Sequence, residues 1–303
     1  MNQELPKFCN NANWNKDLTE LSKTLFNFPF GKNHSILYDS LIEMYNEKNV
    51  PEFLCFDFSF DNISNFSYIK SQCPNPEYVG FDVPSYFNYL PKNIEERKII
   101  MVVAVDPLRR EKEHQKKITI GTPFGFNSNQ VGDYWKFLSA LTSQGYTAYL
   151  TDTFKMFFRS ENKVSSEIES YKHPDFDIHQ EIFAREVKIV KPDLIVTLGT
   201  IPRVWFSNLK KGKFNLSDLK DICLDVTHKE HEKLYYKVNY EEKEDTLVPI
   251  LPLMHLSRRP VASLRKTIYN LASDSADDLV KKYMDLISQK LKLHYNYPLQ
   301  GID

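Results

Sequence analysis

Four apolar runs of strand length are the strongest pattern in this sequence of 303 residues. They cover residues 98–105, 146–150, 194–198 and 247–253. Continuous apolar runs of this length are typical of strands that are buried on both faces of a parallel or mixed sheet. The sequence therefore predicts a central, mostly parallel sheet built from these four segments.

Apolar residues at helical spacing lie between the runs and predict helices that flank the sheet. One pattern consists of Tyr134, Leu138 and Leu141, and another of Phe183, Val187 and Val190. Lys191-Pro192 is expected to end the second helix, because proline disfavours helical geometry in the residue before it. Strands that alternate with helices are typical of βαβ units, so we expect an α/β fold.

The remaining segments are expected to complete a single domain over residues 1–303. Two amphipathic patterns predict N-terminal helices; their apolar positions are Leu18, Leu21 and Leu25, then Leu37, Leu41 and Met44. Residues 51–96 are rich in aromatics, proline and asparagine, and we expect short strands or loops that form an irregular covering layer there. Alternating apolar positions within 222–243 predict inserted strand material. The catalytic core is expected over 97–265, with closing helices over 266–303.

Composition excludes several classes of protein. With 42% hydrophobic, 14% aromatic and 26% charged residues, the chain is expected to fold. No apolar run approaches the roughly 18 residues of a membrane span, and the first residues do not form a secretion signal. Cys9, Cys55, Cys73 and Cys223 are scattered, without a C-x-x-C pair. We therefore expect a cytoplasmic protein with neither a membrane segment nor a disulfide framework.

The charges nearly balance, with 39 Lys+Arg against 40 Asp+Glu. Contact with nucleic-acid phosphates must therefore come from local basic clusters. The sequence contains no glycine-rich nucleotide-binding motif and no histidine pair at metal-ligand spacing on one helix. We expect a monomer without metal or cofactor.

Polar residues follow the four runs where ligands bind in open α/β sheets, beyond the carboxyl ends of the strands. The segments are Asp106-Pro107-Leu108-Arg109, Thr151 to Lys155, Gly199-Thr200 and His255 to Arg259. We expect Asp106, Asp152 and His255 to converge on one rim.

These segments resemble motifs of the uracil-DNA glycosylase superfamily, in order and at comparable spacing. Val105-Asp106-Pro107 is similar to the Asp-Pro of GQDPYH, Gly121-Thr-Pro-Phe-Gly125 to GRPFVG, and Thr151-Asp-Thr-Phe-Lys155 to a TNVVK-like segment. Lys191 to Gly199 resembles KPxVIVALG, and His255-Leu-Ser257 resembles HPS. The resemblance covers roughly residues 97–265 and implies the three-layer fold of that family, with DNA as the partner.

The resemblance also implies the chemistry. A glycosylase flips a base out of DNA and hydrolyses its N-glycosidic bond, which builds positive charge on the sugar and negative charge on the base. Asp106 would stabilise the sugar and position or deprotonate a water. His255, neutral or protonated, would donate to the base O2. We expect water, and no amine, to act as the nucleophile.

Base and DNA contacts are assigned in the same way. Pro107 would line the base site, Phe124 or Phe126 would stack on the flipped base, and Asp152 would read its edge. DNA contacts are expected from Arg109, Ser257, Arg258 and Arg259.

Two residues depart from the family pattern. The family usually has Asn at the position of Asp152, and an ionised carboxylate can only accept hydrogen bonds. It suits a base with an exocyclic amine better than uracil, unless burial keeps it protonated. Leu256 replaces the proline of HPS. The expected substrate is thus uracil, a deaminated purine or a modified pyrimidine, with Asp152 favouring a base other than uracil.

Other interpretations stay open. Asp106-Pro107 also fits a simple turn, His255 a rim histidine without function, and Asp152 a helix or turn cap. The same fold could belong to a catalytically silent sensor of lesions or modified bases, which would bind nucleic acid in a salt-dependent way. A hydrolase of small nucleosides or nucleotides could use the same rim.

Overall fold

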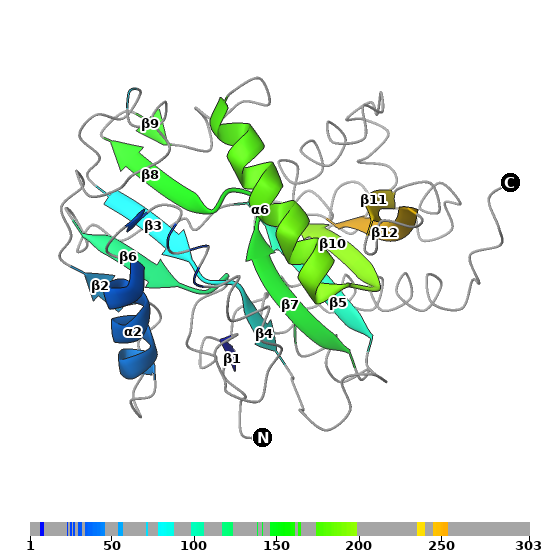
Figure 1. The fold of residues 1–303 in the computed structure, drawn as a ribbon, viewed down its shortest axis with the longest axis horizontal. Coiled ribbons are helices and arrows are strands. Elements are labelled where there is room, and N and C mark those ends of the chain that lie inside the picture. The colour runs from blue at the N-terminus through cyan, green and yellow to red at the C-terminus, as the bar shows by residue number, and fades with distance from the viewer. Residues whose placement is uncertain are drawn as a thin grey trace, which may run out of the picture.

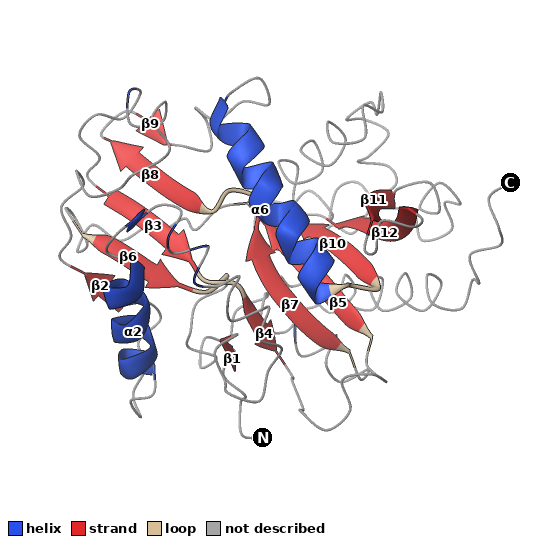
Figure 2. Ribbon diagram, in the orientation of Figure 1, coloured by secondary structure: helices blue, strands red, loops and turns tan. Residues whose placement is uncertain are grey.

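The computed structural model describes part of the chain, and Figures 1 and 2 show its arrangement. The described residues are 7–8, 23, 25, 27, 30–31, 34–45, 54–56, 71, 78–87, 98–105, 117–123, 138, 141, 146–160, 163–164, 174–198, 235–239 and 245–253. In this part the chain forms mixed β-sheets accompanied by helices, which is an α/β class of fold.

A seven-stranded sheet contains all four segments that the sequence predicts as core strands. Its order is β1-β4-β7-β5-β10-β12-β11. The four predicted segments form β5 (Ile99–Ala104), β7 (Thr147–Asp152), β10 (Leu194–Leu198) and β12 (Asp245–Leu253). They are neighbours and pair in parallel. The outer strands β1 (Lys7–Phe8), β4 (Ser85–Phe87) and β11 (Tyr235–Asn239) pair antiparallel.

The central strands are buried along their length, which explains their apolar sequences. Every residue of β7 and β10 is buried, as expected of strands with both faces covered. Helix α6 (Pro174–Val190) lies across this sheet (Figure 2). Its predicted apolar positions, Phe183, Val187 and Val190, are all buried. Leu138 and Leu141 are likewise helical and buried, whereas Tyr134 lies outside the described residues.

Helix α6 ends where the sequence predicts. Its last residue is Val190, and Lys191 adopts a left-handed φ of 47°. The Lys191 N–H donates to the Val187 carbonyl at 2.9 Å, which satisfies one of the last carbonyls of the helix. Pro192 then leads into β10, so the chain turns directly from the helix into the sheet.

Part of residues 51–96, where we expect short strands or loops in a covering layer, forms short strands of a second, five-stranded sheet. Its order is β2-β6-β3-β8-β9. The strands are β2 (Leu54–Phe56), β6 (Ile118–Gly121), β3 (Tyr78–Asp82), β8 (Met156–Ser160) and β9 (Lys163–Val164). Residues 79–87 are all buried. Side chains on both faces of this stretch are therefore covered, and the sequence lacks the regular alternation of apolar and polar residues that marks a strand with one exposed face.

Helix α2 (His34–Tyr45) lies beside the second sheet, near β2 and β6 (Figure 1). Leu37 and Leu41 on its predicted face are buried, as is the helical Leu25 of the preceding pattern. The Phe30 ring meets the Phe81 ring of β3 edge to face, with centroids 5.4 Å apart. The prediction of N-terminal helices holds for these residues. Leu18 and Leu21 lie outside the described part.

The two sheets are joined by two strands that pass from one into the other. β3 continues through Val83 and Pro84 into β4, and β7 continues through residues 153–155 into β8. These two continuous segments pair antiparallel on both sides of the junction, β3 with β8 in one sheet and β4 with β7 in the other. The junction is therefore made by a bent two-stranded ribbon rather than by a loop.

The other predicted elements are partly described. β11 lies within the segment 222–243 and pairs antiparallel with β12, so strand material is present there as expected. The closing helices of residues 266–303 lie outside the described residues. No helix in the described part is long and apolar enough to span a bilayer.

Thr197 offers a test of packing in the main sheet. Its side chain is 0% exposed, and its hydroxyl has no hydrogen-bond partner among the described residues. An unpaired buried hydroxyl destabilises a fold, so Thr197→Val should raise the free energy of unfolding by about 1 kcal/mol.

Thr153→Val is the matched control, because the equally buried Thr153 hydroxyl donates to the Ala104 carbonyl at 2.9 Å. It should lower stability by about 1 kcal/mol. Urea unfolding of both variants measures the difference, and a loss of stability in Thr197→Val would contradict this account of its hydroxyl.

Candidate functional site at the sheet junction

The carboxyl ends of β5, β7, β10 and β12 lie at one edge of the main sheet, since the four strands pair in parallel. The last residues of these strands are Ala104, Asp152, Leu198 and Leu253. In the sequence, Val105 precedes Asp106, and Leu253 stands two residues before His255. Of the expected site residues the structure describes Asp152. The others lie outside the described residues: Asp106, Pro107, Arg109, Phe124, Phe126, His255, Ser257, Arg258 and Arg259.

Asp152 is the last residue of β7 and pairs in register with Ala104 of β5. Its side chain is 4% exposed. Because side chains alternate along a strand, its carboxyl group lies on the opposite face of the sheet from Thr151. Thr151 faces α6, where its hydroxyl donates to Glu186. The structure thus puts Asp152 at the expected edge, buried and facing away from α6.

The chain beyond Asp152 is attached to the end of β5. The backbone N–H and the hydroxyl of Thr153 both donate to the Ala104 carbonyl, at 3.0 and 2.9 Å. The backbone N–H of Phe154 donates to the Val105 carbonyl at 3.0 Å. Val105, the residue that follows β5, therefore lies beside the residues that follow β7.

The segment that precedes Phe124 reaches the same junction. β6 runs parallel to β3, and its last residue, Gly121, pairs with Asp82 at the end of β3. The Val83 N–H donates to the Gly121 carbonyl at 2.7 Å, where the chain passes into the main sheet. Thr122 and Pro123 are both buried there. Three of the five motifs named in the sequence thus begin or lie at the sheet junction.

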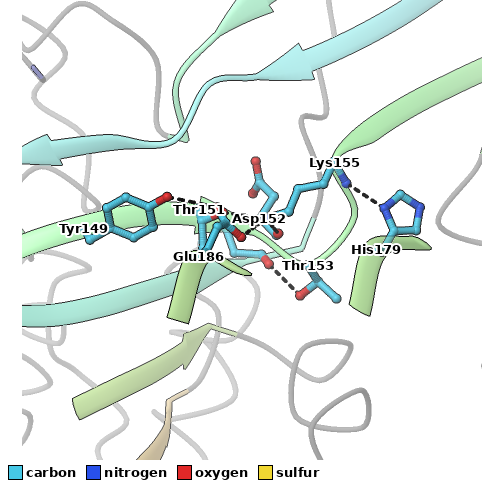
Figure 3. A network of polar contacts seen from close by, with 8 residues as sticks. Tyr149, Thr151, Asp152, Thr153, Lys155, His179 and Glu186 are labelled. Carbon is cyan, nitrogen blue, oxygen red and sulfur yellow. Dashed lines mark hydrogen bonds and ion pairs between the residues drawn. The ribbon is translucent and has the colours of Figure 1, made fainter. Parts of the chain in front are cut away.

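A buried ion pair lies beneath this edge (Figure 3). Lys155 Nζ is 2.5 Å from Glu186 Oε2, and the two side chains are 2% and 0% exposed. Lys155 Nζ also donates to Thr151 Oγ1 at 2.6 Å and to the Asp152 carbonyl at 2.7 Å. All three N–H donors of the ammonium group therefore have acceptors.

Helix α6 supplies two acceptors of this network, Glu186 and His179. Glu186 Oε1 accepts from the Tyr149 and Thr151 hydroxyls at 3.0 and 2.6 Å, while Oε2 accepts from Lys155. About two helical turns earlier, His179 Nδ1 accepts the backbone N–H of Lys155 at 3.2 Å. An imidazole nitrogen that accepts carries no proton, so this contact requires His179 with Nδ1 unprotonated.

The sequence prediction did not include Lys155, Glu186 or His179 as members of this network. A signal was present in α6, because Glu186 falls three residues after Phe183 and four before Val190, within the buried stripe. His179, four residues before Phe183, belongs to the same stripe. Titratable side chains on the buried face of a helix need partners in the core, but the spacing alone does not name them.

Among the described residues, no group of three His, Cys, Asp or Glu side chains lies close enough together to hold a metal ion.

No protein-family model matches the sequence, and neither does any curated protein. The functional argument therefore depends on the motifs and the geometry of the edge.

Removal of the buried cation should destabilise the protein strongly. Lys155→Met leaves the Glu186 carboxylate buried without its counter-ion, which should lower the free energy of unfolding by about 3–5 kcal/mol. Chemical denaturation measures the loss.

A matched control lies on the solvent side of the same helix. Arg185 pairs with Glu181 there, with side chains 53% and 62% exposed. Arg185→Met should cost at most about 1 kcal/mol, because exposed ion pairs contribute little. Equal losses in Lys155→Met and Arg185→Met would contradict the importance assigned to the buried pair.

Proposed function

We propose that this chain is a DNA base glycosylase with the three-layer fold of the uracil-DNA glycosylase superfamily. It acts as a cytoplasmic monomer, without a cofactor, on a flipped-out uracil, deaminated base or modified base. The observation that carries the proposal is the edge of the main sheet. Four parallel neighbouring strands end there, and three of them lead into segments that resemble glycosylase motifs with an acid, a base-reading residue or a histidine.

The chemistry follows from the charges that develop as the bond to the base breaks. Asp106 stabilises the sugar as it becomes positive and orients the attacking water. His255 donates a hydrogen bond to the base O2 as the base becomes negative. Phe124 or Phe126, beside Pro107, stacks on the base, and Arg109, Ser257, Arg258 and Arg259 contact the DNA strand.

Water is the nucleophile in this proposal, although Lys155 stands in the TNVVK-like segment. A lysine that attacks the sugar must present an unprotonated amine to the substrate. The Lys155 side chain is 2% exposed, and its ammonium group donates to Glu186, Thr151 and Asp152. These contacts support a hydrolytic reaction over one that forms a covalent amine intermediate.

Asp152 is the residue that selects the base. In this proposal its carboxylate is ionised and has acceptors but no donors, so it matches a base edge with an exocyclic amine and repels the O4 of uracil. Its position at the end of β7, beside the end of β5, supports a role close to Asp106.

Base excision is tested with oligonucleotides that carry uracil, hypoxanthine, xanthine or substituted pyrimidines, followed by alkali to cleave abasic sites. Wild-type protein should cleave at one or more of these bases. Asp106→Asn and His255→Ala should each lower single-turnover excision by about 10²–10⁴-fold, as expected for loss of a catalytic acid–base or charge-stabilising group.

Other outcomes of this assay favour the alternatives. Salt-dependent binding without cleavage favours a silent sensor, and hydrolysis of free nucleosides without affinity for oligonucleotides favours a small-molecule hydrolase. Full activity in both variants would reject Asp106 and His255 as the catalytic pair.

Asp152→Asn tests base selection. The amide introduces a donor that pairs with uracil O4, so the ratio of kcat/KM for an amine-bearing base over uracil should fall about ten- to a hundredfold. Competition between the two oligonucleotides measures the ratio directly. An unchanged ratio would reject Asp152 as the residue that reads the base.

A further inference from the structure

The segment that carries Asp152 contains more residues than the strand it faces. Phe81 pairs with Met156 and Ser85 with Leu150, so three residues, 82–84, face five residues, 151–155. Two extra residues must therefore be accommodated where the ribbon bends from one sheet into the other. Such a bulge leaves backbone groups outside the ladder, and these need other partners when they are buried.

The backbone groups of the bulge have hydrogen-bond partners on β5, on α6 and within the bulge itself. The Thr153 and Phe154 N–H groups donate to β5, at the Ala104 and Val105 carbonyls. The Lys155 N–H donates to His179 on α6. The Asp152 carbonyl accepts from the side chain of Lys155, three residues further on in the same bulge. The lysine side chain thus folds back over its own segment and binds the backbone of the residue proposed to read the base.

Glu186 determines where the lysine head group lies. The carboxylate is fully buried and is itself oriented by the Tyr149 and Thr151 hydroxyls on β7. The Phe183 ring on α6 lies below the ammonium group, with its centroid 5.9 Å from Nζ. The head group therefore has a fixed site among β7, α6 and the bulge, and the Asp152 backbone is held by it.

Stability alone does not account for this arrangement. Two buried charges lose their hydration, so apolar side chains of similar size often stabilise a core equally well. What an ion pair with directed hydrogen bonds adds is a defined geometry for the groups it contacts. Here those groups are Thr151 and Asp152 at the carboxyl edge.

We infer that Lys155, held by Glu186, is a positioning residue that fixes the backbone of Asp152 so that its carboxylate meets the edge of the flipped base. This inference rests on the proposed function and adds the interaction that holds the base-selecting residue in place. Lys155 contacts no substrate atom in this role and acts through Asp152.

The test separates positioning from stability. Lys155→Met combined with Glu186→Gln removes both charges and keeps an amide oxygen that the Tyr149 and Thr151 hydroxyls can donate to. The control combines Arg185→Ala with Glu181→Ala, which removes the exposed pair from the same helix. Both proteins are compared with wild type in urea unfolding, in amide exchange and in excision of an amine-bearing base against uracil.

Positioning predicts a specific pattern. In the buried double variant, amides of residues 152–155 should exchange at least about tenfold faster relative to those of β10. The kcat/KM ratio between the two bases should fall about tenfold, while the exposed control matches wild type. Adding Asp152→Asn to the buried double variant should lower the ratio no further than Asp152→Asn alone, because both changes act through one carboxylate.

Different failures have different meanings. If wild-type protein excises a base and the folded double variant keeps the full kcat/KM ratio and slow exchange, the inference is overturned and the proposed function stands. If wild-type protein excises no base at all, the proposed function fails and the inference falls with it. Should the double variant not fold, Lys155→Arg replaces it, since it keeps a cation beside Glu186. An unchanged ratio in that variant overturns positioning, and a reduced one supports it.

Discussion

The buried pair of Lys155 and Glu186 is the interaction on which the junction of the two sheets depends. β7 leaves the main sheet at Asp152, and β8 begins the second sheet at Met156. The intervening bulge is tied to β5 by two backbone N–H groups and to α6 by Lys155 and His179. Without a cation at this point, a fully buried carboxylate and two buried hydroxyls would lose their arrangement together.

The same junction explains why distant parts of the sequence meet. β5, β6 and β7 come from different regions of the chain, yet β5 and β7 end side by side and β6 ends next to the crossing from β3 to β4. The segments with glycosylase-like motifs begin at these ends. The second sheet thus contributes to the candidate site, because its strand β6 ends at the junction, three residues before Phe124 in the sequence.

The central sheet and α6 could be predicted because burial on both faces leaves a simple pattern. Most buried residues of β10 and of the α6 stripe need only be apolar, so sequence and structure agree there. The pairing of short strands into the second sheet could not be predicted, because these strands lie among aromatic and proline residues and show no regular alternation. The buried network was missed for another reason: Glu186 appeared as one polar residue in an apolar stripe, and nothing in the spacing connected it with Lys155, 31 positions away.

The ribbon that connects the sheets also limits how the molecule can move. Domains that close around a ligand usually rotate about a few residues of flexible chain. Here two hydrogen-bonded strands cross together, and Val83, Thr153 and Phe154 bond to strands on either side of the bend. Rotation of one sheet against the other would break these bonds at once. The bent ribbon therefore opposes rotation of one sheet against the other at this junction.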